Sequence, residues 1–133
     1  MCIRDSPESD LHPIRTLKKI SSLGVEPGIA LNPETSIESV AYLLGYIKYL
    51  LVMTVTPGFS GQEYLNFMDR KIAKLLEYKK EYGFTLILDG ACSYDVIQRH
   101  HTDGVDGFIL GSSVLFGKAE SYKDIISKLR KIH

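Results

Sequence analysis

The chain has 133 residues, 44% of them hydrophobic, and its 16 basic and 16 acidic side chains give a formal net charge of zero. This length and composition predict one globular core without a second domain. The neutral charge gives no reason to expect nucleic acid or an anionic membrane as a partner, and no apolar run approaches the roughly 20 residues of a membrane helix. Two cysteines without metal-binding spacing, Cys2 and Cys92, favour a reduced, cytoplasmic protein. A small molecule is the expected ligand.

The first six residues lack the apolar core of a signal peptide. They also match no pattern further along the chain. We therefore interpret residues 1–10 as a leader, either artefactual or disordered, and residues 11–133 as the domain.

Helix and strand patterns then alternate. The first predicted helix ends at Gly24 and has an apolar face made of Leu11, Ile14, Leu17 and Ile20. A short strand is predicted at residues 25–31. Thr35 and Glu38 have the spacing of a capping box, which predicts a second helix whose buried residues are Ile37, Val40, Ala41 and Leu44.

Residues 49–55 are almost wholly apolar, which is typical of a strand covered on both faces in a parallel sheet. The next helix ends at Gly83 and buries Met68, Ile72, Leu75 and Leu76. The remaining predicted elements are a strand at 85–88, a helix from Ser93 to Gly104, a strand at 108–110 and a helix behind Ser121.

This order gives four strands, each followed by a helix. Repeated βα units with short links predict right-handed crossovers and a parallel sheet, and therefore the α/β class. Periodicity leaves two architectures open, an open doubly wound sheet and part of a closed barrel.

Active sites in parallel α/β folds lie at the carboxyl ends of the strands. Three of these ends combine glycines with small polar residues, at 56–62, 89–92 and 111–113. The last can bind phosphate through backbone N–H groups, or be an ordinary turn before a short helical turn at 114–116. Asp89 can act as a general acid/base or metal ligand, or cap a turn. Residues 56–62 can form a hinged lid or a rigid connection.

The four histidines are weaker candidates for a site, because none has a spaced carboxylate or cysteine partner. We interpret them as surface residues or as residues that complement a helix dipole: His12, His100, His101 and His133.

Residues 53–62, MTVTPGFSGQ, resemble the strand-6 signature MTVNPGFGGQ of the ribulose-phosphate 3-epimerase family. Asp89-Gly90 and Gly111-Ser112 resemble the family's strand-7 and strand-8 ends, and residues 28–33 resemble its strand 5. The match runs from Leu11 to the carboxyl terminus in one register. It implies the C-terminal half of a (β/α)8 TIM barrel, strands 5–8 with their helices, with the N-terminal half missing.

The resemblance implies a sugar-phosphate 3-epimerase, in which two aspartates exchange protons with a ketose phosphate through an enediolate. It implies that Asp89 is both a catalytic residue and a ligand to a divalent metal, zinc first, with iron, manganese or cobalt as alternatives. Relatives of full length are expected to be homo-oligomers. The substrate and its phosphate would be held by Gly58, Phe59, Ser60, Gly61, Gly90, Ala91, Gly111, Ser112 and Ser113.

Two departures from the family pattern matter. Asp89-Gly90-Ala91-Cys92 looks like the D-allulose-6-phosphate 3-epimerase branch, and Ser60 points weakly the same way, so allulose 6-phosphate is favoured and D-ribulose 5-phosphate comes next. Cys92 is interpreted as a packing residue. The family's other metal ligands, two histidines and an aspartate, and its second catalytic aspartate have no counterpart here, so we predict weak metal binding and no turnover by this chain alone.

Two alternatives stay open. One is another phosphate-binding barrel enzyme, a lyase or synthase, although no lysine ends a strand here as such lyases commonly require. The other is a non-catalytic half-barrel that assembles with a partner.

Overall fold

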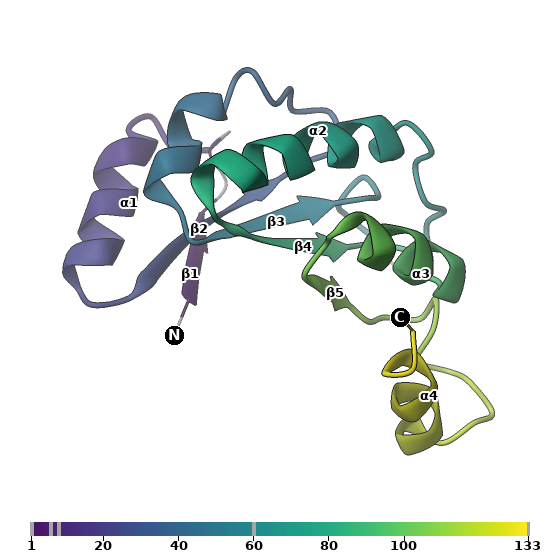
Figure 1. Cartoon of the computed structure of the whole chain (residues 1–133). Helices are drawn as coiled ribbons and strands as arrows, with labels where there is room; N and C mark the ends of the chain where they lie inside the picture. The colour runs from purple at the N-terminus through teal and green to yellow at the C-terminus, as the bar shows by residue number, and fades with distance from the viewer. Residues whose placement is uncertain (1, 6, 8, 60, 133) are drawn as a thin grey trace.

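The computed structural model describes residues 2–5, 7, 9–59 and 61–132, and centres on one parallel sheet. Its five strands pair in chain order (Figure 1): β1 (Cys2–Asp5), β2 (Glu26–Leu31), β3 (Tyr49–Met53), β4 (Thr85–Asp89) and β5 (Gly107–Ile109). The predicted count of four strands is thus one too few. The additional strand, β1, lies within the predicted leader and pairs with β2 from Cys2↔Glu26 to Asp5↔Ile29.

The strand order distinguishes the two architectures that periodicity left open. A doubly wound sheet reverses its strand order at a switch point, whereas here each strand pairs with the next in sequence. Right-handed crossovers in one direction place successive helices on the same face. Figure 1 shows this arrangement, with α1 (Pro13–Ser22), η1 (Ala41–Tyr46), α2 (Met68–Tyr82) and α3 (Tyr94–Asp103) along one side of the sheet. The winding is that of part of a (β/α)8 barrel; which half it represents stays a prediction.

The core lies between the sheet and these helices. Alternate strand residues face the helices and are 1% exposed or less: Ile29, Leu31, Leu50, Val52, Leu86 and Leu88. Leu17, Leu44, Met68, Ile72 and Leu75 belong to the same cluster and come from α1, η1 and α2. The intervening residues, which include Met53 and Asp89, lie on the opposite face because side chains alternate along a strand.

Four helix ends have the capping residues that the sequence predicts. Gly83 and Gly104 end α2 and α3 in the left-handed conformation, with φ of 72° and 110°. Ser93 and Ser121 cap α3 and α4 (Tyr122–Leu129) by accepting hydrogen bonds from the backbone N–H groups of Val96 and Asp124. These four local predictions are confirmed.

The helix predicted after Thr35 is wrong in type. The structure has a 3-10 helix at Ala41–Tyr46, whose N-cap residue is Val40, and the Glu38 carboxylate pairs with Lys74 of α2. The chain before and into this helix is closed by bonds between residues three apart: the Val40 N–H donates to the Ile37 carbonyl at 3.0 Å, and the Leu43 N–H to the Val40 carbonyl at 2.9 Å.

Leu11 was predicted to face the core. It lies before α1, which begins at Pro13, and is 92% exposed.

Candidate functional site

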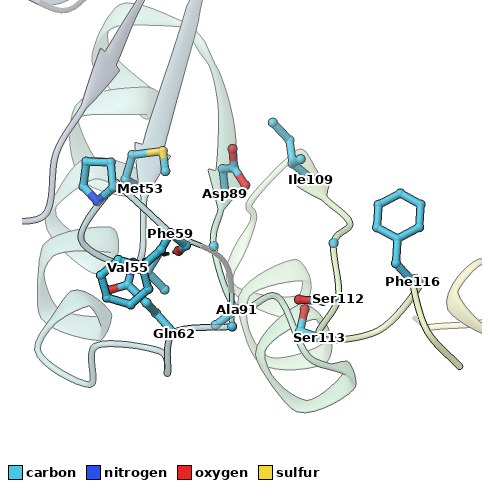
Figure 2. A pocket seen from close by; sticks show the side chains of 15 residues that line it. Met53, Val55, Phe59, Gln62, Asp89, Ala91, Ile109, Ser112, Ser113 and Phe116 are labelled. Carbon is cyan, nitrogen blue, oxygen red and sulfur yellow. Dashed lines mark hydrogen bonds between the residues drawn. The ribbon is translucent and has the colours of Figure 1, made fainter.

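A cavity of about 840 Å³ lies at the carboxyl ends of β3, β4 and β5 (Figure 2). Its wall comes from the three strand ends that the sequence analysis selected. The predicted site residues that line it are Gly58, Phe59, Gly61, Asp89, Gly90, Ala91, Gly111, Ser112 and Ser113. Ser60, the remaining one, lies outside the described residues. The end of β2 is not among the lining segments.

Asp89 is the last residue of β4 and projects on the face away from the helices. Its register partners are Met53 of β3 and Ile109 of β5, and both line the cavity beside it. Figure 2 shows the Asp89 carboxylate between these two apolar side chains. Asp89 is half-buried, so its carboxylate is accessible to a ligand and lies between two apolar side chains. A carboxylate so placed suits proton transfer to a bound substrate.

The main chain after Asp89 turns sharply at Gly90 and Ala91. Their φ values are 115° and 48°, and Ala91 is a non-glycine residue in a region that costs about 1–2 kcal/mol. A Cβ atom on Gly90 would lie 2.7 Å from Cγ2 of Val55, closer than packing permits. Only glycine therefore fits at position 90, and the cavity has bare backbone in its wall at this point.

Cys92 follows this turn and is buried. Its Sγ lies 3.7 Å from the carbonyl oxygens of Leu88 and Gly90. Burial, and next the negative charge of Asp89, raise the pKa of the Cys92 thiol to about 12, against a smaller opposing effect of the backbone at Gly90. The thiol stays protonated at neutral pH, which supports the packing role over a nucleophilic one.

The segment after β3 is held by polar contacts near its ends. The Gln62 side-chain amide donates hydrogen bonds to the carbonyl oxygens of Thr56 and Phe59, the latter at 3.0 Å. The Thr56 hydroxyl donates to the Glu34 carboxylate at 2.8 Å. Phe59, between these contacts, is 76% exposed at the edge of the cavity. These contacts hold the two ends of the segment, at Thr56 and Gln62, in place beside the cavity.

The segment after β5 forms a compact helical turn at residues 112–117. The Gly111 carbonyl accepts from the N–H groups of Leu115 at 2.9 Å and Phe116 at 3.2 Å, as the predicted short helical turn requires. Figure 2 shows Ser112 and Ser113 on the opposite side of the cavity from Phe59 and Gln62. The two small hydroxyl side chains therefore lie across the cavity from the larger side chains of Phe59 and Gln62 (Figure 2).

Sequence reasoning missed six lining residues: Met53, Val55, Pro57, Gln62, Ile109 and Phe116. The alternation of side chains along a strand could have identified Met53 and Ile109, because both are register partners of Asp89 and lie on the same face of the sheet. Gln62 stands inside the motif but was not assigned a role.

His100 was interpreted as a surface residue or as one that complements a helix dipole; the surface alternative is wrong, and His100 lies in the last turn of α3. It is 2% exposed, with Nε2 at 2.9 Å from the Tyr64 hydroxyl and 3.2 Å from Asp69. Burial alone would raise the pKa of Asp69, but hydrogen bonds from Tyr64 and Arg99 hold it below its usual value. These residues lie outside the cavity lining, so the cluster joins α2 to α3 and does not form part of the site.

The fit to a metal ion is incomplete. Among residues 2–5, 7, 9–59 and 61–132, no group of three or more His, Cys, Asp or Glu side chains is placed to hold a metal. Asp89 is the one carboxylate that lines the cavity in this part of the chain. The residues present therefore do not make a metal centre by themselves.

The described helices include none long and apolar enough to cross a membrane. The fold and the cavity together define a singly wound α/β protein with a cavity at the carboxyl ends of its strands, walled by glycine-rich backbone, two serines and one carboxylate.

Comparison with known proteins gives the family. The model of the ribulose-phosphate 3 epimerase family matches residues 2–115, and the chain belongs to this family. It is 36% identical over 121 residues to the ribulose-phosphate 3-epimerase of Methanocaldococcus jannaschii, which covers 90% of this chain and 51% of that protein. It is 39% identical over 113 residues to the Helicobacter pylori (strain 26695) ribulose-phosphate 3-epimerase, covering 84% and 52%. For the chloroplastic ribulose-5-phosphate-3-epimerase of Arabidopsis thaliana the identity is 34% over 131 residues, covering 92% and 45%. The chain thus spans about half the length of these relatives.

Proposed function

We propose that this chain supplies one wall of the active site of a ketose-phosphate 3-epimerase: its phosphate-binding backbone and one of its two acid/base carboxylates. The observation that carries the proposal is the placement of Asp89 in one cavity with three glycine-containing strand ends. Glycine-rich backbone and serine hydroxyls suit a phosphate, and a carboxylate beyond them suits the carbon chain that the phosphate anchors.

Epimerisation at the carbon beside a ketone needs a base on one face of that carbon and an acid on the other. Asp89 either removes the C3 proton or returns one to the opposite face of the enediolate, depending on the direction of reaction. The negative charge that develops on the enediolate oxygen requires stabilisation by positioned donors or a cation. The described residues provide only Asp89 toward such a cation, so we assign the second carboxylate and the remaining metal ligands to residues outside this set. The preference for zinc, then iron, manganese or cobalt, belongs to the same proposal.

For the substrate we propose D-allulose 6-phosphate first, because Ala91-Cys92 after Asp89-Gly90 resembles the corresponding segment of that branch. D-ribulose 5-phosphate is the second candidate, and the names of the relatives favour it. Both place a phosphate and a C2 ketone at opposite ends of a polyol chain, so the same wall accepts either. A cytoplasmic location and a homo-oligomeric complete enzyme are further parts of this proposal.

The competing enzyme class is a lyase or synthase that uses a lysine at a strand end. In the part of the chain that the structure describes, no lysine lines the cavity. This supports the epimerase over the lysine-dependent classes. A non-catalytic half-barrel stays the alternative if no catalysis is found.

The test has a binding arm and a catalytic arm. In the binding arm, this chain is titrated with allulose 6-phosphate, ribulose 5-phosphate and the unphosphorylated ketoses. We expect binding of the phosphates and none of the ketoses. In the catalytic arm, exchange of the C3 hydrogen with deuterated water is followed for this chain alone and for the chain mixed with the N-terminal half of the M. jannaschii relative, with divalent metal present.

We expect hydrogen exchange only when the two chains are mixed. The substrate whose C3 hydrogen exchanges faster identifies the branch of the family. Exchange by the isolated chain would contradict the assignment of the other ligands to residues outside it. Lack of phosphate binding would contradict the function itself.

A further inference from the structure

Thr54 is a fully buried polar residue directly behind the cavity wall. It is one of only two polar or charged residues among those described as buried, and its exposure is 0%. Its neighbours Met53 and Val55 line the cavity, whereas Thr54 does not. The Thr54 side chain therefore approaches the wall from the core side, where it meets the turn that follows Asp89.

Thr54 holds two successive carbonyl groups of that turn. Its backbone N–H donates to the Asp89 carbonyl at 2.8 Å, and its hydroxyl oxygen lies 3.1 Å from the same carbonyl oxygen. The hydroxyl also hydrogen-bonds the Gly90 carbonyl. The Cys92 thiol approaches the Gly90 carbonyl from the same turn at 3.7 Å. Both carbonyls are thus directed toward Thr54.

The geometry of the peptide bond converts these contacts into an orientation of N–H groups. In a trans peptide the N–H points opposite to the C=O of the same plane, and the chain has no cis peptide among its described residues. Directing the Asp89 carbonyl toward Thr54 turns the Gly90 N–H away from Thr54. Directing the Gly90 carbonyl there turns the Ala91 N–H away as well. Since Gly90 and Ala91 line the cavity, both N–H groups face its side of the wall.

We propose that Thr54 is a positioning residue: its backbone N–H fixes the Asp89–Gly90 peptide and its hydroxyl fixes the Gly90–Ala91 peptide, so that the Gly90 and Ala91 N–H groups present two donors to an anionic group in the cavity. The inference rests on the proposed phosphate-binding function and adds the residue that orients this part of the site. The turn needs such support because Ala91 occupies a positive φ, a conformation that neighbouring contacts must hold in place.

The experiment compares three threonine variants in a Cys2→Ser background, so that Cys92 is the one thiol that reports. Thr54→Val removes the hydroxyl and keeps the shape, and Thr54→Ser keeps the hydroxyl. Thr102→Val is the matched control, because the Thr102 hydroxyl also donates to a backbone carbonyl, that of Gln98 at 2.9 Å, but on exposed helix α3. Each variant is measured for the amide resonances of Gly90 and Ala91, the alkylation rate of Cys92, and binding of inorganic phosphate; urea unfolding verifies that it folds.

We expect Thr54→Val to shift the Gly90 and Ala91 resonances, to raise the Cys92 alkylation rate about tenfold and to weaken phosphate binding about tenfold. Thr54→Ser should restore all three quantities to within about twofold of the parent, and Thr102→Val should leave them unchanged. A general loss of stability in Thr54→Val would shift amide resonances throughout the chain, whereas loss of positioning should shift those of Gly90 and Ala91.

Unchanged amide resonances and unchanged Cys92 alkylation in a folded Thr54→Val variant would overturn the proposal. If Thr54→Val does not fold, the decision passes to Thr54→Ser: parent-like amides support the proposal, and displaced amides overturn it. If the parent binds no phosphate, the proposed function fails, and the amide and thiol measurements still decide whether Thr54 positions the turn.

Discussion

Two segments of the cavity wall, the turn at residues 89–92 and the segment at residues 56–62, are held in different ways. The turn is fastened from the core side, by Thr54 at 0% exposure and by the buried thiol of Cys92. The segment after β3 is fastened by solvent-exposed contacts, from Gln62 to Thr56 and from Thr56 to Glu34. Buried hydrogen bonds leave unpaired groups when they are cut, whereas water replaces exposed ones. Changes at the turn should therefore damage fold and site together, and changes at the other segment should alter binding alone.

The largest expected effect on stability is at Gly90, in the turn at residues 89–92 that is held from the core side. Gly90→Ala combines a φ of 115° with a contact of 2.7 Å to Val55, so we expect a loss of roughly 3 kcal/mol in the free energy of unfolding. The matched control is Gly24→Ala, at a φ of 71° with open space around it, which should cost about 1 kcal/mol. Urea unfolding of both variants gives the difference. Equal losses would show that the close approach to Val55 contributes nothing.

Asp89→Asn tests whether the carboxylate acts electrostatically within the turn. The Asp89 charge is a cause of the raised Cys92 pKa, so its removal should lower that pKa below about 12 and make the thiol react at lower pH. The measurement is the pH dependence of Cys92 alkylation in the Cys2→Ser background. Asp95→Asn, on the exposed surface of α3, is the control and should leave the profile unchanged. In the assembled enzyme the same Asp89→Asn variant should abolish C3 hydrogen exchange.

The alkaline stability of the chain tests the burial of Cys92. Its pKa is about 12 in the folded state and about 9 for an unperturbed cysteine thiol, so the buried neutral thiol favours folding fully below pH 9. As the pH rises from 9 to 12 the unfolded chain ionises first, and this contribution is lost. Urea unfolding across that range should therefore show a steeper fall for the parent than for Cys92→Ala. Parallel curves would mean that Cys92 ionises as readily in the folded chain as in the unfolded one.

The smallest effect on stability is expected at Gln62. Gln62→Met removes the amide donor to Thr56 and Phe59 at similar size, and because both contacts are exposed the free energy of unfolding should change by less than about 1 kcal/mol. Binding of phosphate should nonetheless weaken, because the two ends of the segment are no longer fixed. Titration with inorganic phosphate measures this, with Gln98→Met on α3 as the control. A stability loss as large as that of Gly90→Ala would contradict the contrast between the two segments.

The sequence by itself determined the features that depend on neighbouring residues. Gly83, Ser93 and Gly104 identified helix ends because caps are formed by a few adjacent groups. The apolar strands and the glycine-containing strand ends were equally readable, so the βα order and most of the cavity wall were predicted, Asp89 among them.

Only the tertiary structure decided the features that join distant parts of the chain. The Thr54 hydroxyl bonds the carbonyl of Gly90, 36 residues further along the chain, and His100 contacts Tyr64, which is also 36 residues away. The Glu38 carboxylate, predicted to take part in a capping box, pairs with Lys74 of α2. The direction of winding likewise became visible only in the strand pairing. Such contacts depend on how elements pack, and no local period or turn signal encodes which side chains packing will bring together.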